Sequence, residues 1–234
     1  MEFKLWALIM LIFDRHGLRR PAPDTVGYVL DAGANDGQSA EMMAVDFERM
    51  GLRVLAVEPL LSNIRMIEHR AKRVPNLEVL HAGLGATNGT EGHYPHAWDS
   101  RQGSIYLQIS LWNTQSNHGS STYPILTIDS LFAPETRRTL VLAHLDLEGL
   151  ESDALSAANE TIMRDRPVIT VETYPQMLET RHRAVMDIFE RADYDVHTIN
   201  ERVGGIPDGR NRIAVPRESR HLKWIIGKYF AEVS

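Results

Sequence analysis

The chain has 234 residues and a formal net charge of −6 at pH 7, with 43% hydrophobic and 24% charged residues. This composition supports a folded core, and the acidic balance without a dominant basic stripe argues against nucleic acid as a partner. The absence of cysteine excludes disulfides, thiolate nucleophiles and cysteine-based metal sites.

The N-terminus carries an apolar run, residues 5–13, directly after Lys4. The run is shorter than the roughly 20 residues that span a bilayer, and no small-x-small cleavage site follows it. Three interpretations stay open: a helix packed on the domain or a partner, an interfacial membrane anchor, and a targeting segment. We expect residues 1–20 to form an apolar helix or anchor on a cytoplasmic or membrane-peripheral protein, with weak membrane association through residues 5–13.

The first half of the remaining chain alternates strand and helix patterns. GYVLDAG predicts a strand over 26–31, and a helix follows as far as Gly51. LRVLAVEP predicts a second strand that Pro59 ends, then comes an amphipathic helix over 60–74. NLEVLHAG predicts a third strand. This alternation is typical of βαβ units and a parallel sheet.

Residues 83–124 break this regularity, being rich in glycine, histidine and polar residues. Within them, residues 105–112 alternate and predict an antiparallel strand. Because long irregular segments in compact domains are usually functional, we expect a substrate-loop insertion here.

Regularity returns after this insertion. TLVLAHLDLEG and PVITVETYP predict strands, and we expect helices over about 150–163 and 176–193. YDVHTIN and NRIAVP predict a pair of antiparallel strands, and residues 218–230 predict a final helix. No domain boundary is visible, so residues 21–234 are expected to form one domain, a three-layer α/β sandwich.

The ends of the predicted strands share a chemical feature. Open α/β sheets bind ligands at the carboxyl ends of their strands, and four of the five parallel-type ends here carry carboxylates. The residues at these ends are Asp31, Glu58, His81 to Gly83, Asp146 to Glu148, and Glu172.

The first strand end, DAGANDG, has the pattern of a ligand-binding turn. Gly33 and Gly37 allow a sharp turn and a close backbone approach. Asn35 stands where a dinucleotide fingerprint has its middle glycine, and an acid at Asp31 suits an amine better than a pyrophosphate. Glu58 ends the second strand, where an acid typically accepts hydrogen bonds from ribose hydroxyls. NAD and S-adenosylmethionine both contain such a nucleoside.

With these motifs, the chain resembles the FkbM-type S-adenosylmethionine-dependent methyltransferases. VLDAGANDG, LAVEP, LTIDSLF, LDLEGLESDAL and VITVE occur in the order of that family, over roughly residues 26 to 173. DxGANxG followed by AVEP marks this class of methyltransferase, and the DxEGxE block narrows the resemblance to this family.

The resemblance implies a class I methyltransferase fold: a Rossmann-like three-layer sandwich whose seven-stranded, mostly parallel sheet has an antiparallel last strand. It also implies S-adenosyl-L-methionine as cofactor and O-methylation of a sugar or specialised metabolite, so that the partner is a small-molecule or saccharide acceptor. The implied cofactor-binding residues are Asp31, Gly33, Ala34, Asn35 and Gly37 at the methionine part, Glu58 at the ribose, Ala82 and Gly83 near the adenine, and Asp146.

The fourth strand suggests the catalytic groups. Period-two alternation places His144, Asp146 and Glu148 on one face of LVLAHLDLEG. Transfer to an alcohol needs a proton acceptor, and we expect a base at Asp146 or Glu148, assisted by Glu172. Mg²⁺ shared by Asp146 and Glu172 is the alternative, but we do not expect it to be obligatory. We expect Glu151, near a helix start, to be structural.

For His144 and for the polar and aromatic residues of the irregular segment, a purely structural role is the alternative to a functional one. Family members commonly carry lysine where this chain has His144, which favours a satisfied core histidine over a permanent positive charge. Side chains in the irregular segment could contact a sugar, although each alone is more often an ordinary loop residue, and none forms a zinc motif. They are His93, Tyr94, His96, Trp98, His118 and Tyr123.

Two other functions compete with methyl transfer. An NAD-dependent oxidoreductase on a Rossmann-like fold shares the acid after the second strand but requires another glycine spacing. A non-catalytic cofactor-binding or scaffolding protein is the third alternative. The sequence leaves the oligomeric state open.

Overall fold

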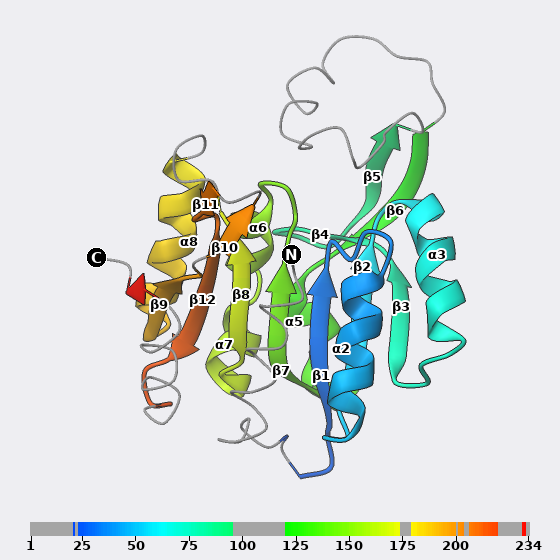
Figure 1. Cartoon of the computed structure of the whole chain (residues 1–234), viewed down its shortest axis with the longest axis horizontal. Coiled ribbons are helices and arrows are strands. Elements are labelled where there is room, and N and C mark those ends of the chain that lie inside the picture. The colour runs from blue at the N-terminus through cyan, green and yellow to red at the C-terminus, as the bar shows by residue number, and fades with distance from the viewer. Residues whose placement is uncertain are drawn as a thin grey trace.

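In the computed structural model of the chain, the described residues are 21, 23–95, 120–173, 179–199, 201–203, 206–219 and 231–232. A twisted central sheet dominates the molecule, and helices lie on both of its faces (Figure 1). The eight strands of this sheet follow the order β13-β9-β12-β8-β7-β1-β2-β3. The predicted apolar run at residues 5–13 and the predicted helix at 218–230 lie outside or largely outside the described residues.

The first half of the sheet agrees with the prediction from the sequence. Its elements are β1 (Val26–Ala32), α2 (Gln38–Glu48), β2 (Arg53–Glu58), α3 (Leu61–Ala71) and β3 (Leu77–His81). The three strands pair in parallel, β1 with β2 and β2 with β3. Since helices connect parallel strands, all three carboxyl ends meet at one edge of the sheet.

The second half contains β7 (Arg138–Leu145), α6 (Glu151–Ser156), α7 (Asn159–Asp165), β8 (Val168–Glu172) and α8 (Glu179–Arg191). β7 pairs in parallel with both β1 and β8.

The single helix predicted over 150–163 is wrong, because α6 and α7 are separate helices. Asp129 explains the interruption. Its backbone N–H donates to the carbonyl of Ala157 at 3.0 Å, and its carboxylate accepts from the N–H groups of Glu160 and Thr161 at 3.2 and 2.8 Å. A carboxylate that accepts from the first free N–H groups starts a new helix at this point.

The last strands confirm the predicted antiparallel pair. β12 (Asn211–Pro216) runs antiparallel to both β8 and β9 (Tyr194–Thr198). The seven strands of the predicted class I methyltransferase fold are therefore present, with the last one reversed. Two additions were not predicted: the edge strand β13 (Ala231–Glu232) and a small hairpin of β10 (Glu201–Val203) and β11 (Ile206–Asp208).

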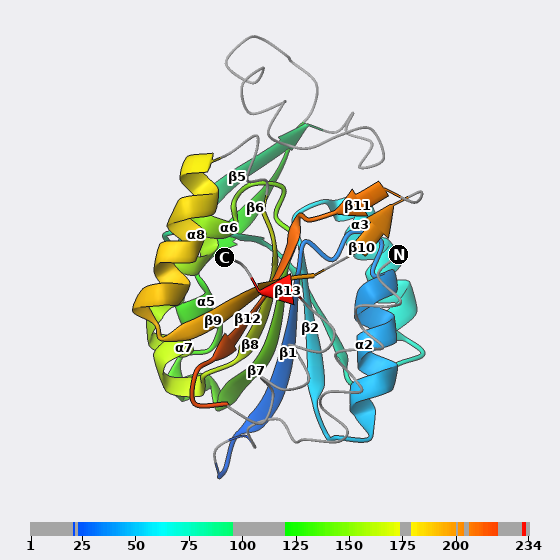
Figure 2. The same ribbon diagram turned by 60° about the vertical axis from the view of Figure 1, so that its left-hand side comes forward.

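The segment predicted to be irregular is partly regular. β4 (Gly83–Leu84), β5 (Gly89–Pro95) and β6 (Ser120–Leu126) form a separate three-stranded sheet in the order β4-β6-β5. β5 and β6 extend away from the main sheet (Figure 2). Short helical turns follow, α5 (Ile128–Leu131) and η1 (Pro134–Thr136). The predicted strand over residues 105–112 lies outside the described residues.

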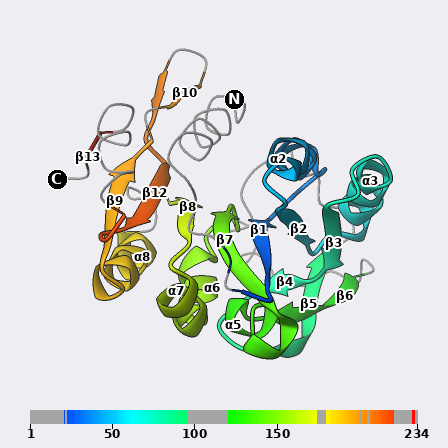
Figure 3. The ribbon, with the colours of Figure 1, turned by 90° about the horizontal axis from the view of Figure 1, so that it is seen from below.

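The core has two layers, one on each face of the main sheet. Val29, Val54 and Leu142 belong to one buried cluster together with Phe47 of α2 and Ile67 of α3. Their neighbours along the strands point the other way and pack with residues of α5, α7 and α8: Leu30, Leu55 and Ala143 join Phe132, Ile162 and Phe189. Figure 3 shows α2 and α3 on one side of the sheet and α5 to α8 on the other. This is the predicted three-layer sandwich.

A search of the described part of the chain for a helix of membrane-spanning length and hydropathy finds none.

Candidate functional site

The parallel register brings the predicted strand-end residues to one edge of the sheet. Asp31 lies opposite His144 on β7, and His144 lies opposite Thr170 on β8. Asp31 is only 1% exposed, so its carboxyl group lies within the fold at the point where β1 ends. The carboxyl ends of β1, β2, β7 and β8 therefore form the candidate site, as expected for an open α/β sheet.

The turn after β1 has the unusual backbone that its glycines predict. Three of its residues have positive φ angles: 84° at Gly33, 51° at Asn35 and 79° at Gly37. The N–H groups of Gly33 and Ala34 both donate to the carbonyl of Val57, at 3.0 and 3.3 Å. The turn is thereby fixed against the end of β2 before helix α2 starts.

Both glycines are required by the protein itself. A Cβ atom on Gly33 would lie 1.9 Å from the carbonyl oxygen of Asp146, and one on Gly37 would lie 2.8 Å from the side chain of Ile67. Asp146 in turn donates its backbone N–H to the carbonyl of Ala32 at 3.0 Å. Neighbouring protein atoms thus already require glycine at both positions, and a close approach of this backbone to a ligand stays a prediction.

The tight contact at Gly33 yields a prediction with a matched control. Gly33→Ala is expected to lower the free energy of unfolding by about 3 kcal/mol or more, from the left-handed backbone and the clash combined. Gly51 has a φ of 71°, but a Cβ atom there meets nothing within 4 Å. Gly51→Ala is therefore expected to cost only about 1 kcal/mol. Urea denaturation of both variants measures the difference. Equal losses of unfolding free energy would contradict the close contact between Gly33 and Asp146.

Glu58 holds the turn from the end of β2. It is 4% exposed, and its Oε2 accepts from the N–H of Asn35 at 2.9 Å. Its Oε1 accepts from the N–H of Leu60 at 2.9 Å and from the side-chain amide of Asn63 at 3.2 Å. A carboxylate has about four acceptor positions, so three described donors leave one on Oε2 for a further hydroxyl. Burial raises the pKa of Glu58 to about 7, although these hydrogen bonds oppose the shift.

Arg70, which the sequence did not single out, braces the other side of the turn. Its Nε donates to the carbonyl of Asp36 at 2.8 Å, and its NH2 group to the carboxylate of Asp36 at 3.0 Å. Its NH1 group donates to Glu41 of α2 at 2.5 Å. These charge-assisted contacts join α3 to the turn and fix the turn's shape.

The end of β3 forms the next part of the site. Ala82 is fully buried and donates its N–H to the carbonyl of Glu58 at 3.2 Å. Gly83 begins β4, and the side chain of Tyr123 from β6 packs against it. Ala82 and Gly83 thus lie beside the end of β2, where the resemblance places the adenine.

Carboxylates gather at the ends of β7 and β8. Asp146 and Glu172 share a side-chain hydrogen bond, and the guanidinium of Arg210 lies 2.7 Å from Glu172 Oε1. Although part of Asp146 is exposed, its Oδ1 atom is buried and accepts no hydrogen bond from the described residues. Burial, and then the negative charge of Glu172, raise the pKa of Asp146 well above its usual range. Both effects favour the protonated form of Asp146.

Glu148 borders this pair, but not as a strand residue. The strand predicted as far as Gly149 ends at Leu145, because Glu148 has a φ of 53° and Gly149 one of 102°. The predicted alternation of His144, Asp146 and Glu148 therefore does not extend beyond the strand. Burial and the charge of Glu172 raise the pKa of Glu148, while Arg210 lowers it.

Glu151 organises the loop that carries Asp146 and Glu148. Its Oε1 accepts from the N–H groups of Leu147 and Gly149, at 2.9 and 3.0 Å. Arg181 of α8 donates to the carbonyl of Gly149 at 2.6 Å. The structural role expected for Glu151 agrees with these contacts.

His144 also has the environment expected of a hydrogen-bonded histidine in the core. It is 8% exposed, and its Nδ1 lies 2.9 Å from the hydroxyl of Thr170. Because that hydroxyl donates to the carbonyl of Ala143 at 3.3 Å, Nδ1–H is the donor to Thr170. Burial lowers the pKa of His144 to about 4, so the ring is neutral at pH 7.

Arg210 and Asn63 are the polar neighbours that sequence reasoning missed. Arg210 directly precedes β12, and β12 pairs antiparallel with β8 so that Asn211 lies opposite Glu172. An antiparallel last strand beside β8 therefore brings its first residues to the end of β8. The position of Arg210 could therefore have been predicted from the antiparallel last strand, whereas nothing in the helical pattern around Asn63 marks it as a site residue.

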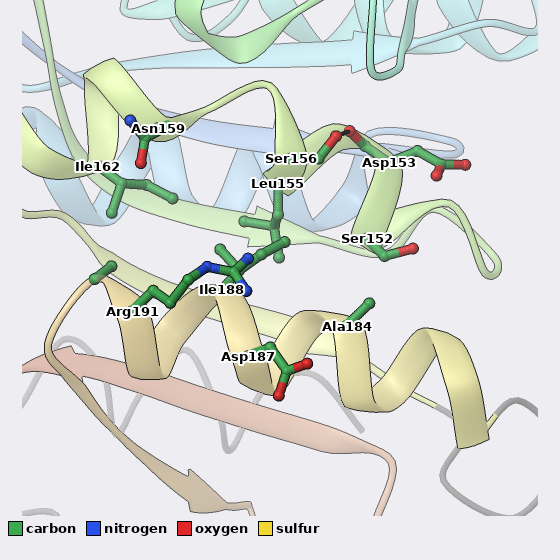
Figure 4. Close-up of a pocket in the computed structure, with 11 residues that line it drawn as sticks. Ser152, Asp153, Leu155, Ser156, Asn159, Ile162, Ala184, Asp187, Ile188 and Arg191 are labelled. Atoms are coloured by element: carbon green, nitrogen blue, oxygen red, sulfur yellow. Dashed lines mark hydrogen bonds between the residues drawn. The ribbon is translucent and has the colours of Figure 1, made fainter.

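A cleft of about 400 Å³ lies elsewhere, between α6, α7 and α8. Figure 4 shows Leu155 of α6 and Ile188 of α8 pointing toward one another across it. None of the residues predicted to bind cofactor or to act in catalysis lines this cleft.

The edge formed by β1, β2, β7 and β8 fits S-adenosylmethionine in its chemistry. The cofactor carries a cationic sulfonium and an ammonium group. The ends of β1, β7 and β8 provide the buried carboxyl groups of Asp31 and Glu172 and the half-buried one of Asp146. Glu58 keeps an acceptor position for a ribose hydroxyl. Within the ranges that the structure describes, no group of three or more histidine or acidic side chains is arranged to hold a metal ion.

Comparison with known proteins points to one family. The family profile described as the methyltransferase FkbM domain matches residues 31–196, more than half of the chain. A search of curated proteins gives no match.

Among solved structures, the methyltransferase FkbM from Methylobacillus flagellatus KT is similar, with a TM-score of 0.54 and 18% identity. The match covers 88% of this chain and 47% of that one, so this chain spans about half of its length. Precorrin-6y C5,15-methyltransferase from Geobacter metallireducens GS-15 has a TM-score of 0.45 at 11% identity, with 90% and 86% of the chains covered. The DszA carbon methyltransferase also has a TM-score of 0.45 at 11% identity, with 91% and 53% covered.

Proposed function

This chain belongs to the FkbM methyltransferase family, and we propose that it is an S-adenosylmethionine-dependent O-methyltransferase acting on a hydroxyl group of a sugar or specialised metabolite. The observation that carries this proposal is the direct contact between the β1 turn and the loop after β7. Gly33 abuts the carbonyl of Asp146, so the candidate cofactor turn and the candidate proton acceptor are adjacent.

The chain's own residues divide into a nucleoside end and a methionine end. At the nucleoside end, Glu58 accepts from a ribose hydroxyl, and Ala82 and Gly83 lie against the adenine. At the methionine end, Asp31 and the backbone of the turn bind the amino-acid portion; this group comprises Gly33, Ala34, Asn35 and Gly37. When bound, S-adenosylmethionine supplies an activated methyl group.

The carboxylates of Asp146, Glu148 and Glu172 provide the group that accepts the proton of the acceptor hydroxyl. As the acceptor oxygen bonds to the methyl carbon and the carbon–sulfur bond breaks, the hydroxyl proton passes to a carboxylate. An ordinary carboxylate is a weak base for an alcohol, but Asp146 has a strongly raised pKa because of its burial and its pairing with Glu172. Glu148 borders the pair and adds negative charge, which favours proton uptake by Asp146.

We expect that no divalent metal is needed. Glu172 already forms an ion pair with Arg210 at 2.7 Å and a hydrogen bond with Asp146, so its charge is compensated by groups of the chain itself. Methyl transfer should therefore proceed unchanged in excess EDTA. Loss of activity in EDTA that Mg²⁺ restores would instead assign a shared cation to Asp146 and Glu172.

Calorimetry and a turnover assay test the proposal against its alternatives. The wild-type chain should bind S-adenosylmethionine and show no heat of binding with NAD; the reverse result would favour an NAD-dependent oxidoreductase. Transfer of labelled methyl to a panel of sugars and hydroxylated metabolites should give product. Cofactor binding without turnover on any acceptor would favour a non-catalytic cofactor-binding protein.

A further inference from the structure

Tyr123 occupies an unexpected place in the fold. It belongs to β6, in the small sheet outside the main one, and sequence reasoning grouped it with loop residues that could contact an acceptor sugar. Its ring centroid nevertheless lies 6.4 Å from that of His81, the last residue of β3. The charge of Glu58, the last residue of β2, acts on its phenol, whose pKa is raised chiefly by burial and further by that charge. Tyr123 therefore lies over the ends of β2 and β3.

The backbone below Tyr123 is shaped to admit its ring. A Cβ atom on Gly83 would lie 2.8 Å from Cε2 of Tyr123 and 3.2 Å from Cδ1 of Ile125. Real Cβ atoms do not approach ring carbons that closely, so the ring can rest in this position only because residue 83 is glycine. The ring is thus held between the small sheet and the edge of the main sheet where Glu58 and Ala82 lie.

We infer that Tyr123 forms a wall of the nucleoside end of the cofactor site, with its ring against the adenosine portion. This inference rests on the proposed function, because it assumes a nucleoside at Glu58. The ring provides the apolar face that a base requires, and Gly83 lets the ring lie at the ends of β2 and β3, where Glu58 is. The small sheet then has a role in cofactor binding.

Two ligands and two substitutions test this inference. S-adenosylmethionine and 5′-methylthioadenosine share the nucleoside, but only the former has the amino-acid portion. Tyr123→Ala should weaken the binding of both by the same factor, about tenfold, because the lost contact is with the shared part. Tyr123→Phe should keep both affinities within about threefold, because the ring remains. Titration calorimetry of the full chain measures the dissociation constants of both ligands for the wild type and the two variants.

Ile125→Ala is the matched control. Ile125 lies two residues along the same strand and packs on Gly83 and Gly85, so its truncation loosens the small sheet without removing the ring. It should change either affinity by less than about twofold, and equal losses in Ile125→Ala and Tyr123→Ala would overturn the inference. So would equal losses in the Phe and Ala variants, or a loss for S-adenosylmethionine alone.

The same titrations separate this inference from the proposed function. If the wild-type chain binds 5′-methylthioadenosine but not S-adenosylmethionine, the proposed function fails, and a loss in Tyr123→Ala still supports the nucleoside wall. If the wild type binds S-adenosylmethionine and Tyr123→Ala binds it equally well, the inference alone fails. If the wild type binds neither ligand, both are overturned.

Discussion

Asp146→Asn is expected to abolish methyl transfer while making the fold more stable at pH 8. Asparagine keeps the size of the side chain and can donate to Glu172, but it cannot accept the acceptor's proton. Loss of a general base typically costs 10²- to 10⁴-fold in rate, so kcat should fall at least about 100-fold. Initial rates with labelled cofactor, together with thermal unfolding at pH 8, measure both effects.

The stability gain follows from the sign of the pKa shift. Burial and Glu172 raise the pKa of Asp146 in the folded state above its unfolded value, so the folded state binds the proton more tightly. The stabilisation from this proton is complete below the unfolded pKa and is lost as the pH rises through the folded pKa. At pH 8 the asparagine variant avoids this cost and should unfold at a higher temperature than the wild type.

The same shift predicts the pH dependence of catalysis. Because the proton acceptor must be ionised, the wild-type rate should rise with pH as Asp146 loses its proton. The residual rate of Asp146→Asn should lack this rise.

Asp165→Asn is the matched control for this prediction. Asp165 is also a buried aspartate, but it lies at the other end of β7, where it accepts from the N–H of Leu140 at 2.8 Å and pairs with Arg164. Its asparagine variant should lose stability and keep cofactor affinity. An Asp146→Asn variant that is active, or that is destabilised like Asp165→Asn, would contradict the role assigned to Asp146.

Glu58→Gln is expected to weaken S-adenosylmethionine binding about 100-fold and to lower the free energy of unfolding by about 2 kcal/mol. The buried carboxylate accepts from three donors, the N–H groups of Asn35 and Leu60 and the amide of Asn63. Glutamine turns one of the two acceptor atoms into a donor that faces another donor. The β1 turn then loses a hydrogen bond, and the ribose loses its acceptor.

The pH dependence of binding provides a second measurement for Glu58. Because burial raises its pKa to about 7, the carboxyl gains a proton as the pH falls through 7 and loses acceptor capacity. Wild-type affinity should fall below pH 7, whereas Glu58→Gln should show no such change.

Glu78→Gln separates the loss of a hydrogen-bonded carboxylate from the loss of cofactor binding, although Glu78 is only half-buried. Glu78 accepts from the hydroxyl of Tyr28 at 2.8 Å and pairs with Arg53 and Arg138, away from the strand ends. Its variant should lose stability with cofactor affinity unchanged. Parallel losses of affinity in both variants would refute a specific role for Glu58.

Much of this site was predictable because a parallel sheet collects residues by topology. Glu58 and Glu172 are the last residues of their strands, and Asp31 is the last but one of β1. Parallel pairing brings those ends to one edge whatever the details of the loops. The pattern of apolar runs was therefore sufficient to predict that these carboxyl groups lie at the same edge.

Residues whose positions depend on long-range contacts could not be predicted, because local sequence patterns do not show such contacts. Arg70 sits in an amphipathic helix, and nothing local shows that it reaches Asp36, 34 positions earlier. Tyr123 belongs to an irregular sequence, and only the pairing of β4 with β6 brings it to Gly83. The break between α6 and α7 depends on Asp129, which comes from a preceding segment.

The most direct test of the central claim is the carbon-13 NMR spectrum of the product formed from S-adenosylmethionine labelled at its methyl carbon. With a hydroxylated acceptor that supports turnover, the label should appear as a methyl ether, and Asp146→Asn should form it at least about 100-fold more slowly. A label attached to carbon in the product would contradict oxygen as the methylated atom. Absence of any labelled product across sugar and metabolite acceptors would contradict the proposed activity itself.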